Sequence, residues 1–259
     1  MTELAETIMD SLAELTRERP MFMHFDSIGL LYLDKTNQDR LECFDAILNG
    51  VAGKGGNLII PAYSYSFCRQ EVFNVDGSPT TLGEPHEFLR ARNPGKRTSD
   101  GIFSYLVFGS HSVFTPHLEK REVQDSFGSG SLIEGILELD GWISAIGGCI
   151  HNTTEIHHIE KKLKVPYRFD KEFPGEVIHP GGELYQQTVI FFCRDLEFFE
   201  KNSLGTRLRR MYDDMESENK MMELNIQGDF LVEYVPFQRL HEYAGERVAR
   251  EPHYLLGKV

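Results

Sequence analysis

The segment 57–67, NLIIPAYSYSF, is an apolar run that directly follows a glycine-rich turn, GKGG at 53–56. Residues 37–52, before this turn, are predicted to form an amphipathic helix because their apolar side chains recur at helical spacing. These side chains are Leu41, Phe44, Ile47, Leu48 and Val51. A strand with a continuous apolar run is typical of a sheet that is covered on both faces. A helix, a glycine cap and a buried strand in this order therefore indicate an α/β fold.

Further strands and helices are predicted along the rest of the chain. Buried strands are expected within 21–33, 101–109 and 140–150, and helices within 2–16, 84–92 and 126–139. Apolar and polar residues alternate over 182–195, which predicts a strand that pairs antiparallel. Residues 195–224 are typical of one or two amphipathic helices. Residues 228–256 are typical of a strand followed by a closing helix. No linker is evident. We expect a single domain over residues 1–259, with a mixed central sheet flanked by helices and a candidate helical lid near 195–225.

The charge balance limits the class of ligand. The chain has 40 acidic residues against 27 Lys and Arg, a formal net charge of −13. Nucleic-acid-binding surfaces normally carry a basic excess, so this class is excluded, whereas a local basic cluster could still bind a small anion.

The cysteines and the apolar segments indicate the cellular compartment in which the protein is expected. Cys43, Cys68, Cys149 and Cys193 form no CxxC pair, which predicts buried thiols in a reducing compartment and no metal site. No stretch approaches the ~18 apolar residues of a membrane span, and the N-terminus lacks a signal-peptide pattern. The expected location is the cytoplasm.

The segment 152–171, NTTEIHHIEKKLKVPYRFDK, lies just beyond the predicted strand at 140–150 and carries the strongest candidate for catalysis. His157 and Glu160 stand three residues apart, which places both side chains on one face of a helix. A carboxylate there can fix the tautomer of an imidazole and keep it basic enough to take a proton near neutral pH. The alternative is a histidine at a helix start with a surface glutamate beside it. Spacing alone favours this second interpretation.

Two more places could present a site. His24, Asp26 and Ser27 stand at the end of the first predicted strand, where α/β proteins commonly bind ligands. The loop FGSGSL at 127–132 precedes a predicted helix, whose free N–H groups suit a phosphate or carbonyl oxygen. GKGG is not such a loop, because a P-loop follows a strand and precedes a helix, and here the order is reversed.

Taken in order, these segments resemble the aminoglycoside 3-N-acetyltransferase family over roughly residues 20–200. The matching stretches are MHFDSIG, GKGGNLIIPAYSYSF, SPTTLGEPHEFLR, RTSDGIFS, FGSGSL, and TEIHHIE followed by VPYRFDKEF. The family has R-S-x-H-P-x-x-S where this chain has RTSDGIFS, so Asp100 and Gly101 replace its His-Pro pair. PAYSYSFC and VPYRFDK also differ from antibiotic-modifying members, and are more similar to a branch associated with surface-polysaccharide gene clusters, whose members acylate amino sugars.

The resemblance implies an acetyl-CoA enzyme with an α/β fold distinct from GCN5-type acetyltransferases. It implies that His157 is the general base, with Glu160, or less directly Asp195, as its orienting carboxylate. Implied coenzyme A contacts are His24, Asp26, Ser27, Arg97, Thr98, Ser104, Gly128 and Ser131. For Arg97, binding a phosphate and lying exposed in a turn are equally favoured. Tyr63 and Tyr65 share one face of a predicted strand, so they could either contact the acceptor with their hydroxyls or pack in the core. Tyr167, Arg168 and Lys171 could contact a nucleotide diphosphate on the acceptor.

We therefore expect an acetyl-CoA-dependent N-acetyltransferase that acylates an amino sugar, nucleotide-linked and used for surface polysaccharide such as O-antigen. Two alternatives stay open. One is acetylation of an aminoglycoside antibiotic, a polycation that suits the acidic chain. The other is a non-catalytic protein that binds coenzyme A or a sugar. The partner is in each case a small molecule, and a homo-oligomer is left open.

Overall fold

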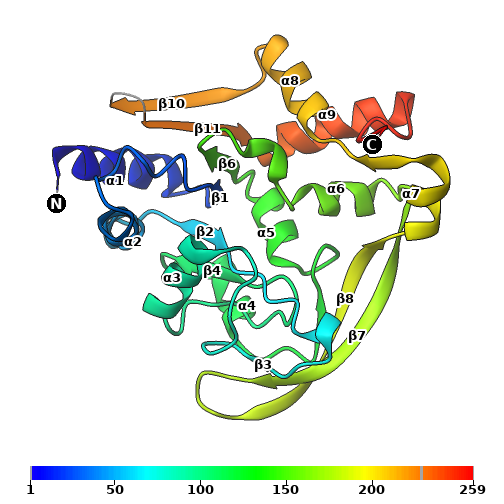
Figure 1. Cartoon of the computed structure of the whole chain (residues 1–259), viewed down its shortest axis with the longest axis horizontal. Coiled ribbons are helices and arrows are strands. Elements are labelled where there is room, and N and C mark those ends of the chain that lie inside the picture. The colour runs from blue at the N-terminus through cyan, green and yellow to red at the C-terminus, as the bar shows by residue number, and fades with distance from the viewer. Residues whose placement is uncertain (1, 228–229, 259) are drawn as a thin grey trace.

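The structure is a computed structural model that describes residues 2–227 and 230–258. Its centre is a six-stranded sheet in the order β10-β11-β6-β1-β2-β4 (Figure 1). The strands are β1 (Met21–Phe25), β2 (Leu58–Pro61), β4 (Tyr105–Phe108), β6 (Trp142–Ile146), β10 (Met222–Gln227) and β11 (Phe230–Pro236). β6, β1 and β2 are parallel to one another. β4 pairs antiparallel with β2 at one edge, and β11 pairs antiparallel with β6 and with the other edge strand, β10. The expected α/β class with a mixed sheet is confirmed.

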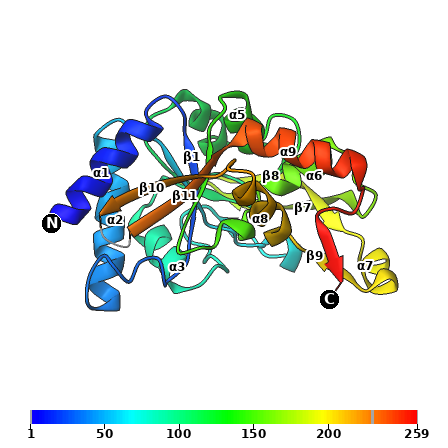
Figure 2. The same cartoon turned by 90° about the horizontal axis from the view of Figure 1, so that it is seen from above.

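Alternating side chains of β1 explain why helices cover both faces of this sheet. Met21, Met23 and Phe25 belong to one hydrophobic core, and Phe22 belongs to the other. Figure 2 shows α1 and α2 together on one side of the molecule and α6 and α9 on the other. The helices are α1 (Glu3–Thr16), α2 (Asn37–Gly53), α3 (Glu84–Arg92), α4 (Thr115–Leu118), α5 (Leu132–Glu138), α6 (Ile156–Lys162), α7 (Leu196–Asn202), α8 (Arg209–Ser217) and α9 (Phe237–Arg250).

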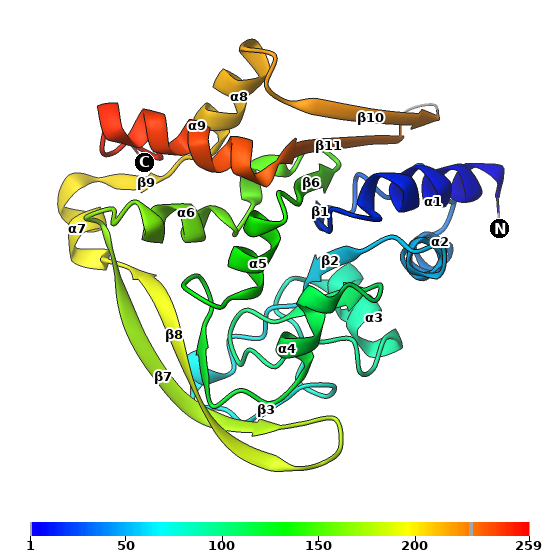
Figure 3. The ribbon, with the colours of Figure 1, turned by 180° about the vertical axis from the view of Figure 1, so that it is seen from behind.

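A long antiparallel ribbon forms a second sheet. β7 (Arg168–Ile178) pairs with β8 (Leu184–Arg194) from Arg168 opposite Arg194 to Ile178 opposite Leu184. β3 (Phe73–Asn74) and β5 (Val123–Asp125) extend it at its edges. Figure 3 shows the ribbon curving away from the end of α6. A short pair, β9 (Leu204–Thr206) and β12 (Leu256–Lys258), lies near the C-terminus. The ribbon therefore brings two arginines to the segment that carries His157.

Several expected elements differ from the observed ones. The helices expected at 2–16, 37–52 and 84–92 are confirmed. The strand expected over 57–67 ends at Pro61, and Tyr65 beyond it adopts a left-handed conformation with φ of 54°. The helical segment expected at 195–224 contains α7 and α8, but β9 separates them and β10 begins at Met222. Residues 228 and 229 of the last expected strand lie outside the described residues.

No strand was predicted for β7, because five of its eleven residues are charged and only Arg168 and Val177 are buried. Of the four cysteines expected to be buried, Cys149 is buried and Cys68 is exposed, and all four are free thiols. In the described part of the chain, no helix has the length and apolar character required to cross a membrane.

Replacing Ile143 of β6 tests the core between the central sheet and α6. Ile143 is fully buried in the core that also holds Phe22. Ile143→Ala is expected to lower the free energy of unfolding by about 2–5 kcal/mol, through lost burial and the remaining cavity. Ile28 is 65% exposed, so Ile28→Ala should cost less than about 0.5 kcal/mol. Urea denaturation measures both, and equal effects would contradict this packing.

Candidate active site

His157 lies at the start of α6 and forms a pair with Glu160 one turn later. β6 ends at Ile146, and Gly147 and Gly148 with φ of 90° and 72° turn the chain toward α6. His157 Nδ1 is 2.6 Å from Glu160 Oε2. The His157 side chain is 15% exposed, whereas that of Glu160 is completely buried. The buried carboxylate therefore holds the Nδ1 side of the imidazole, while another edge of the ring stays accessible to solvent.

Arg168, the first residue of β7, closes the other side of this pair. Its Nε is 2.8 Å from Glu160 Oε2, and its Nη1 donates to the Phe192 carbonyl at 3.1 Å. Its Nη2 lies 3.4 Å from His157 Nε2. Burial lowers the pKa of His157, Glu160 raises it and the arginines lower it, with a net shift below the ordinary value. A neutral imidazole, able to accept a proton, is thus the stable form near pH 7.

His157 opens into a cavity of about 840 Å³ that is lined by α6, the ribbon and the segment leading into α8. Its lining residues are Tyr65, Phe103, His151, Asn152, Thr153, Thr154, His157, Arg168, Phe191, Cys193, Arg194, Leu196, Thr206, Arg207, Leu208 and Arg209. Four of the lining residues are arginines, and no Asp or Glu among the described residues lines the cavity. In a protein with a net charge of −13, this cavity is a local basic site that attracts anions.

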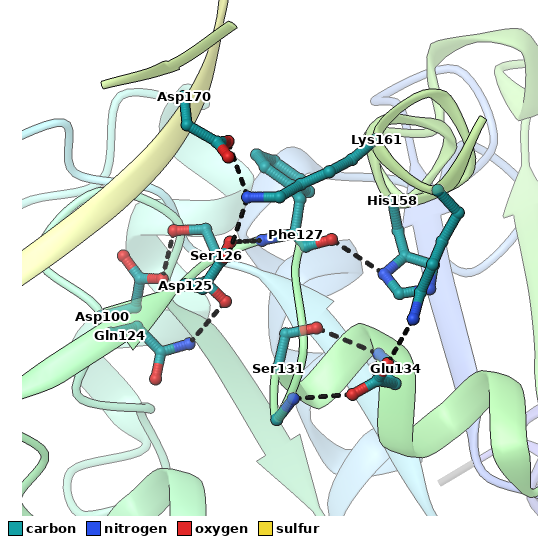
Figure 4. A network of polar contacts seen from close by, with 12 residues as sticks. Asp100, Gln124, Asp125, Ser126, Phe127, Ser131, Glu134, His158, Lys161 and Asp170 are labelled. Carbon is teal, nitrogen blue, oxygen red and sulfur yellow. Dashed lines mark hydrogen bonds and ion pairs between the residues drawn. The ribbon is translucent and has the colours of Figure 1, made fainter. Parts of the chain in front are cut away.

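The Gly/Ser loop before α5 supports α6 from behind (Figure 4). Its Phe127 carbonyl is 2.9 Å from His158 Nδ1, and the Phe127 ring meets the His157 ring edge-on, with centroids 5.3 Å apart. Ser126 Oγ donates to Asp100 Oδ2 at 2.7 Å. Lys161 of α6 contacts Asp125 at 2.7 Å and Asp170 of β7 at 2.6 Å. The loop, α6 and the ribbon are therefore tied together around His157.

The two loop residues predicted to contact coenzyme A, Gly128 and Ser131, have structural roles here. Ser131 is the N-cap of α5, its hydroxyl accepting from Glu134 N–H at 3.1 Å. Gly128 is buried, and a Cβ there would lie 1.9 Å from an Asp125 oxygen. Neither lines the cavity. The glycine is required by close packing, and the serine by the end of a helix.

A second histidine–carboxylate pair fixes the start of α6. His24 Nε2 is 2.7 Å from Glu155 Oε2, and the Tyr105 hydroxyl donates to Glu155 Oε1 at 3.2 Å. The Tyr63 hydroxyl in turn donates to Tyr105 at 3.2 Å. Burial raises the pKa of Glu155, but the contact with His24 outweighs burial and holds it below the ordinary value. The predicted ligand roles of His24 and Tyr63 are replaced by this buried network.

Sequence reasoning missed Glu155. A signal exists in retrospect, because His24 ends a buried strand and Glu155 follows its parallel neighbour. Asp26, also at this strand end, accepts from Gly29 N–H at 2.9 Å, and Ser27 is exposed. Neither lines the cavity, and their contact with coenzyme A stays a prediction.

Arg97, Thr98 and Ser104 form an internal scaffold, and their burial argues against the predicted coenzyme A contacts. Arg97 is 2% exposed. Its Nε donates to Ser104 Oγ at 2.9 Å, and its other nitrogens donate to the carbonyls of Val75, Ser78 and Ala62. Thr98 Oγ1 accepts from Tyr105 N–H at 2.9 Å. The guanidinium is thus engaged by main-chain oxygens and is not available to a phosphate.

The remaining predicted residues fall into two groups. Tyr65 and Arg168 line the cavity, but the Arg168 guanidinium faces Glu160, Phe192 and His157, which replaces the predicted diphosphate contact. Three others lie away from the cavity lining, which argues against their predicted roles. Tyr167 is fully buried against Phe199, Lys171 is exposed on β7, and Asp195 caps α7 by accepting from Phe198 N–H. Glu160, and not Asp195, is the carboxylate beside His157.

Within residues 2–227 and 230–258, no group of three His, Cys, Asp or Glu side chains is placed to hold a metal ion.

Residues 33–248 match the family model described as aminoglycoside 3-N-acetyltransferase. The chain belongs to this family. It is therefore placed among the N-acetyltransferases, as the sequence predicted. No curated protein shows a significant sequence match to the chain.

Solved structures share the fold at low identity. Aminoglycoside acetyltransferase AAC(3)-IIb is 15% identical, with a TM-score of 0.71 over 95% of this chain and 97% of that one. A histidine-to-alanine variant of AAC(3)-IVa in complex with gentamicin is 18% identical, with a TM-score of 0.69 over 98% and 89%. AAC-IIIb in a binary complex with CoASH is 16% identical, with a TM-score of 0.68 over 95% and 95%. Acetyl-CoA as the donor agrees with these relatives.

Replacing Arg97 separates a structural role from phosphate binding. Arg97→Met is expected to lower the free energy of unfolding by roughly 3 kcal/mol or more, because several buried carbonyls lose a charged donor. Affinity for coenzyme A should be unchanged in the folded variant. Arg92→Met is the matched control, since Arg92 is half exposed on α3. Urea denaturation and calorimetric titration measure the two quantities. Normal stability with lost coenzyme affinity would restore the phosphate role.

Proposed function

We propose that the protein transfers an acetyl group from acetyl-CoA to the amino group of an anionic amino sugar, of the nucleotide-linked class used for surface polysaccharide. The observation that supports this most is the cavity itself. A histidine paired with a carboxylate opens into a space lined by three exposed arginines, and no Asp or Glu lines it among the described residues. Acceptor phosphates would be stabilised there, whereas a polycation would face like charges.

His157 acts as the general base in this proposal. Its Nε2 removes a proton from the acceptor amine as the amine nitrogen attacks the thioester carbonyl. The carbon–nitrogen bond forms, the carbon–sulfur bond breaks, and the leaving thiolate takes the proton from the imidazolium. Glu160, 2.6 Å from Nδ1, stabilises the transient positive charge on the ring.

The exposed arginines at the cavity supply binding. Arg194, Arg207 and Arg209 are exposed and line it. A guanidinium can contact two phosphate oxygens at once, so these residues suit the phosphates of the donor as well as those of the acceptor. A donor drawn from the cell's coenzyme A pool also fits the predicted cytoplasmic location.

Acetylation of an aminoglycoside is the second candidate, favoured by the family and by the relative that binds gentamicin. The net charge of −13 attracts a polycation over long range. The basic cavity opposes that attraction at the site of reaction. The two candidates therefore differ in the charge of the acceptor that is turned over.

An acceptor panel with a base variant tests the proposed function. Release of coenzyme A from acetyl-CoA is measured with nucleotide-linked amino sugars, free amino sugars and aminoglycosides. We expect turnover with the nucleotide-linked sugars, and His157→Ala should reduce it by about 10²–10⁴-fold while retaining affinity for coenzyme A. Turnover of aminoglycosides alone would support the second candidate. Undiminished turnover in the variant would contradict the role of His157.

Neutralising Arg207 tests the charge of the acceptor. Arg207→Gln is expected to raise KM for a nucleotide-linked amino sugar roughly tenfold, the effect of one charged hydrogen bond. KM for the corresponding free amino sugar should stay constant. Arg210→Gln is the matched control, because Arg210 pairs with Glu251 outside the cavity lining. Equal changes of KM for both acceptors would show that Arg207 serves the donor alone.

A further inference from the structure

The two ring nitrogens of His157 face chemically opposite groups. Nδ1 is 2.6 Å from an oxygen of the Glu160 carboxylate, which only accepts hydrogen bonds when ionised. Nε2 is 3.4 Å from Nη2 of Arg168, and a guanidinium only donates. One neutral tautomer satisfies both neighbours. Nδ1 carries the hydrogen and donates it to Glu160, and Nε2 keeps its lone pair.

We propose that Arg168 is a positioning residue of the acetyl transfer, which holds His157 as the neutral Nδ1–H tautomer with the Nε2 lone pair facing the acceptor amine. The expected kinetic effects rest on the proposed function, whereas the assignment of the tautomer rests on geometry alone. Arg168 thus positions the base and does not bind a ligand phosphate.

Arg168 is rigidly placed for this role. Its side chain is 1% exposed, its Nη1 is held by the Phe192 carbonyl, and its Nε lies against Glu160. The residue begins β7 directly opposite Arg194 in the ribbon. The contact with His157 is the longest of the three. An incoming amine can therefore replace Nη2 at Nε2 while the other contacts keep the guanidinium in place.

The charges around His157 come from three elements. Glu160 lies on α6, Arg168 on β7 and Arg194 on β8, while the Phe127 ring adds an uncharged wall. Glu160 favours the imidazolium, and both arginines disfavour it. Loss of the Arg168 charge should thus raise the pKa of His157, so that the base becomes protonated, and inactive, at a higher pH than in the wild type.

Long-range ¹H–¹⁵N NMR of the histidine rings tests the tautomer without any turnover. His157 is assigned by the signal that disappears in His157→Ala. In the wild type at pH 7.5 we expect the Nδ1–H form, and an Nε2–H form would overturn the proposal. Because this measurement uses the unaltered protein, poor folding of an Arg168 variant does not affect it.

The pH dependence of kcat/KM tests the effect of the charge. In Arg168→Gln the acidic limb should move to higher pH by about one unit, and NMR should show His157 as a mixture of tautomers. Arg168→Lys keeps the charge, so its acidic limb should stay closer to that of the wild type. Lys171→Gln removes a charge from an exposed site on the same strand and should leave the limb in place.

The outcomes separate the two claims. An unchanged acidic limb and an unchanged tautomer in folded Arg168→Gln would overturn the role of Arg168, whatever the acceptor. No turnover with any acceptor, together with the Nδ1–H form in the wild type and its loss in the variant, would contradict the proposed function and support the placement of His157 by Arg168.

Discussion

The completely buried carboxylate of Glu160 is the group on which the site depends. Its Oε2 contacts both His157 and Arg168. A buried carboxylate is strongly disfavoured unless it is paired. The cation that pairs with it comes from the first residue of β7, so docking of the ribbon against α6 stabilises the carboxylate that contacts the histidine.

The rest of the structure fixes the two elements that meet at Glu160. β6 runs parallel to β1 and leads to α6. The His24–Glu155 pair links the start of that helix to the sheet. Lys161 ties α6 to β7 through Asp170. Asp100 accepts a hydrogen bond from Ser126 in the loop that packs against His157. The RTSDGIFS segment thus has a clear structural role in this chain.

The sequence allowed part of this to be predicted. The spacing of His157 and Glu160 placed both side chains on one helix face, because helical geometry is local. Spacing alone still favoured a surface glutamate, and the family resemblance indicated the contact. The strands β1, β2 and β6 were recognisable from apolar runs. β7 was not, since its charged residues carry no strand pattern and it is formed by pairing with β8. The enclosure of Arg97 was not predicted for the same reason: its partners at Ala62, Val75 and Ser78 are distant in sequence, and only the fold shows that they enclose it.

A crystal structure with coenzyme A and a nucleotide-linked amino sugar would locate the acceptor amine relative to His157. We expect the sugar nitrogen at about 2.6–3.2 Å from His157 Nε2, with the acceptor phosphates against the arginines of the cavity. An amine beyond hydrogen-bonding reach of His157, or acceptor phosphates bound outside this cavity, would contradict it.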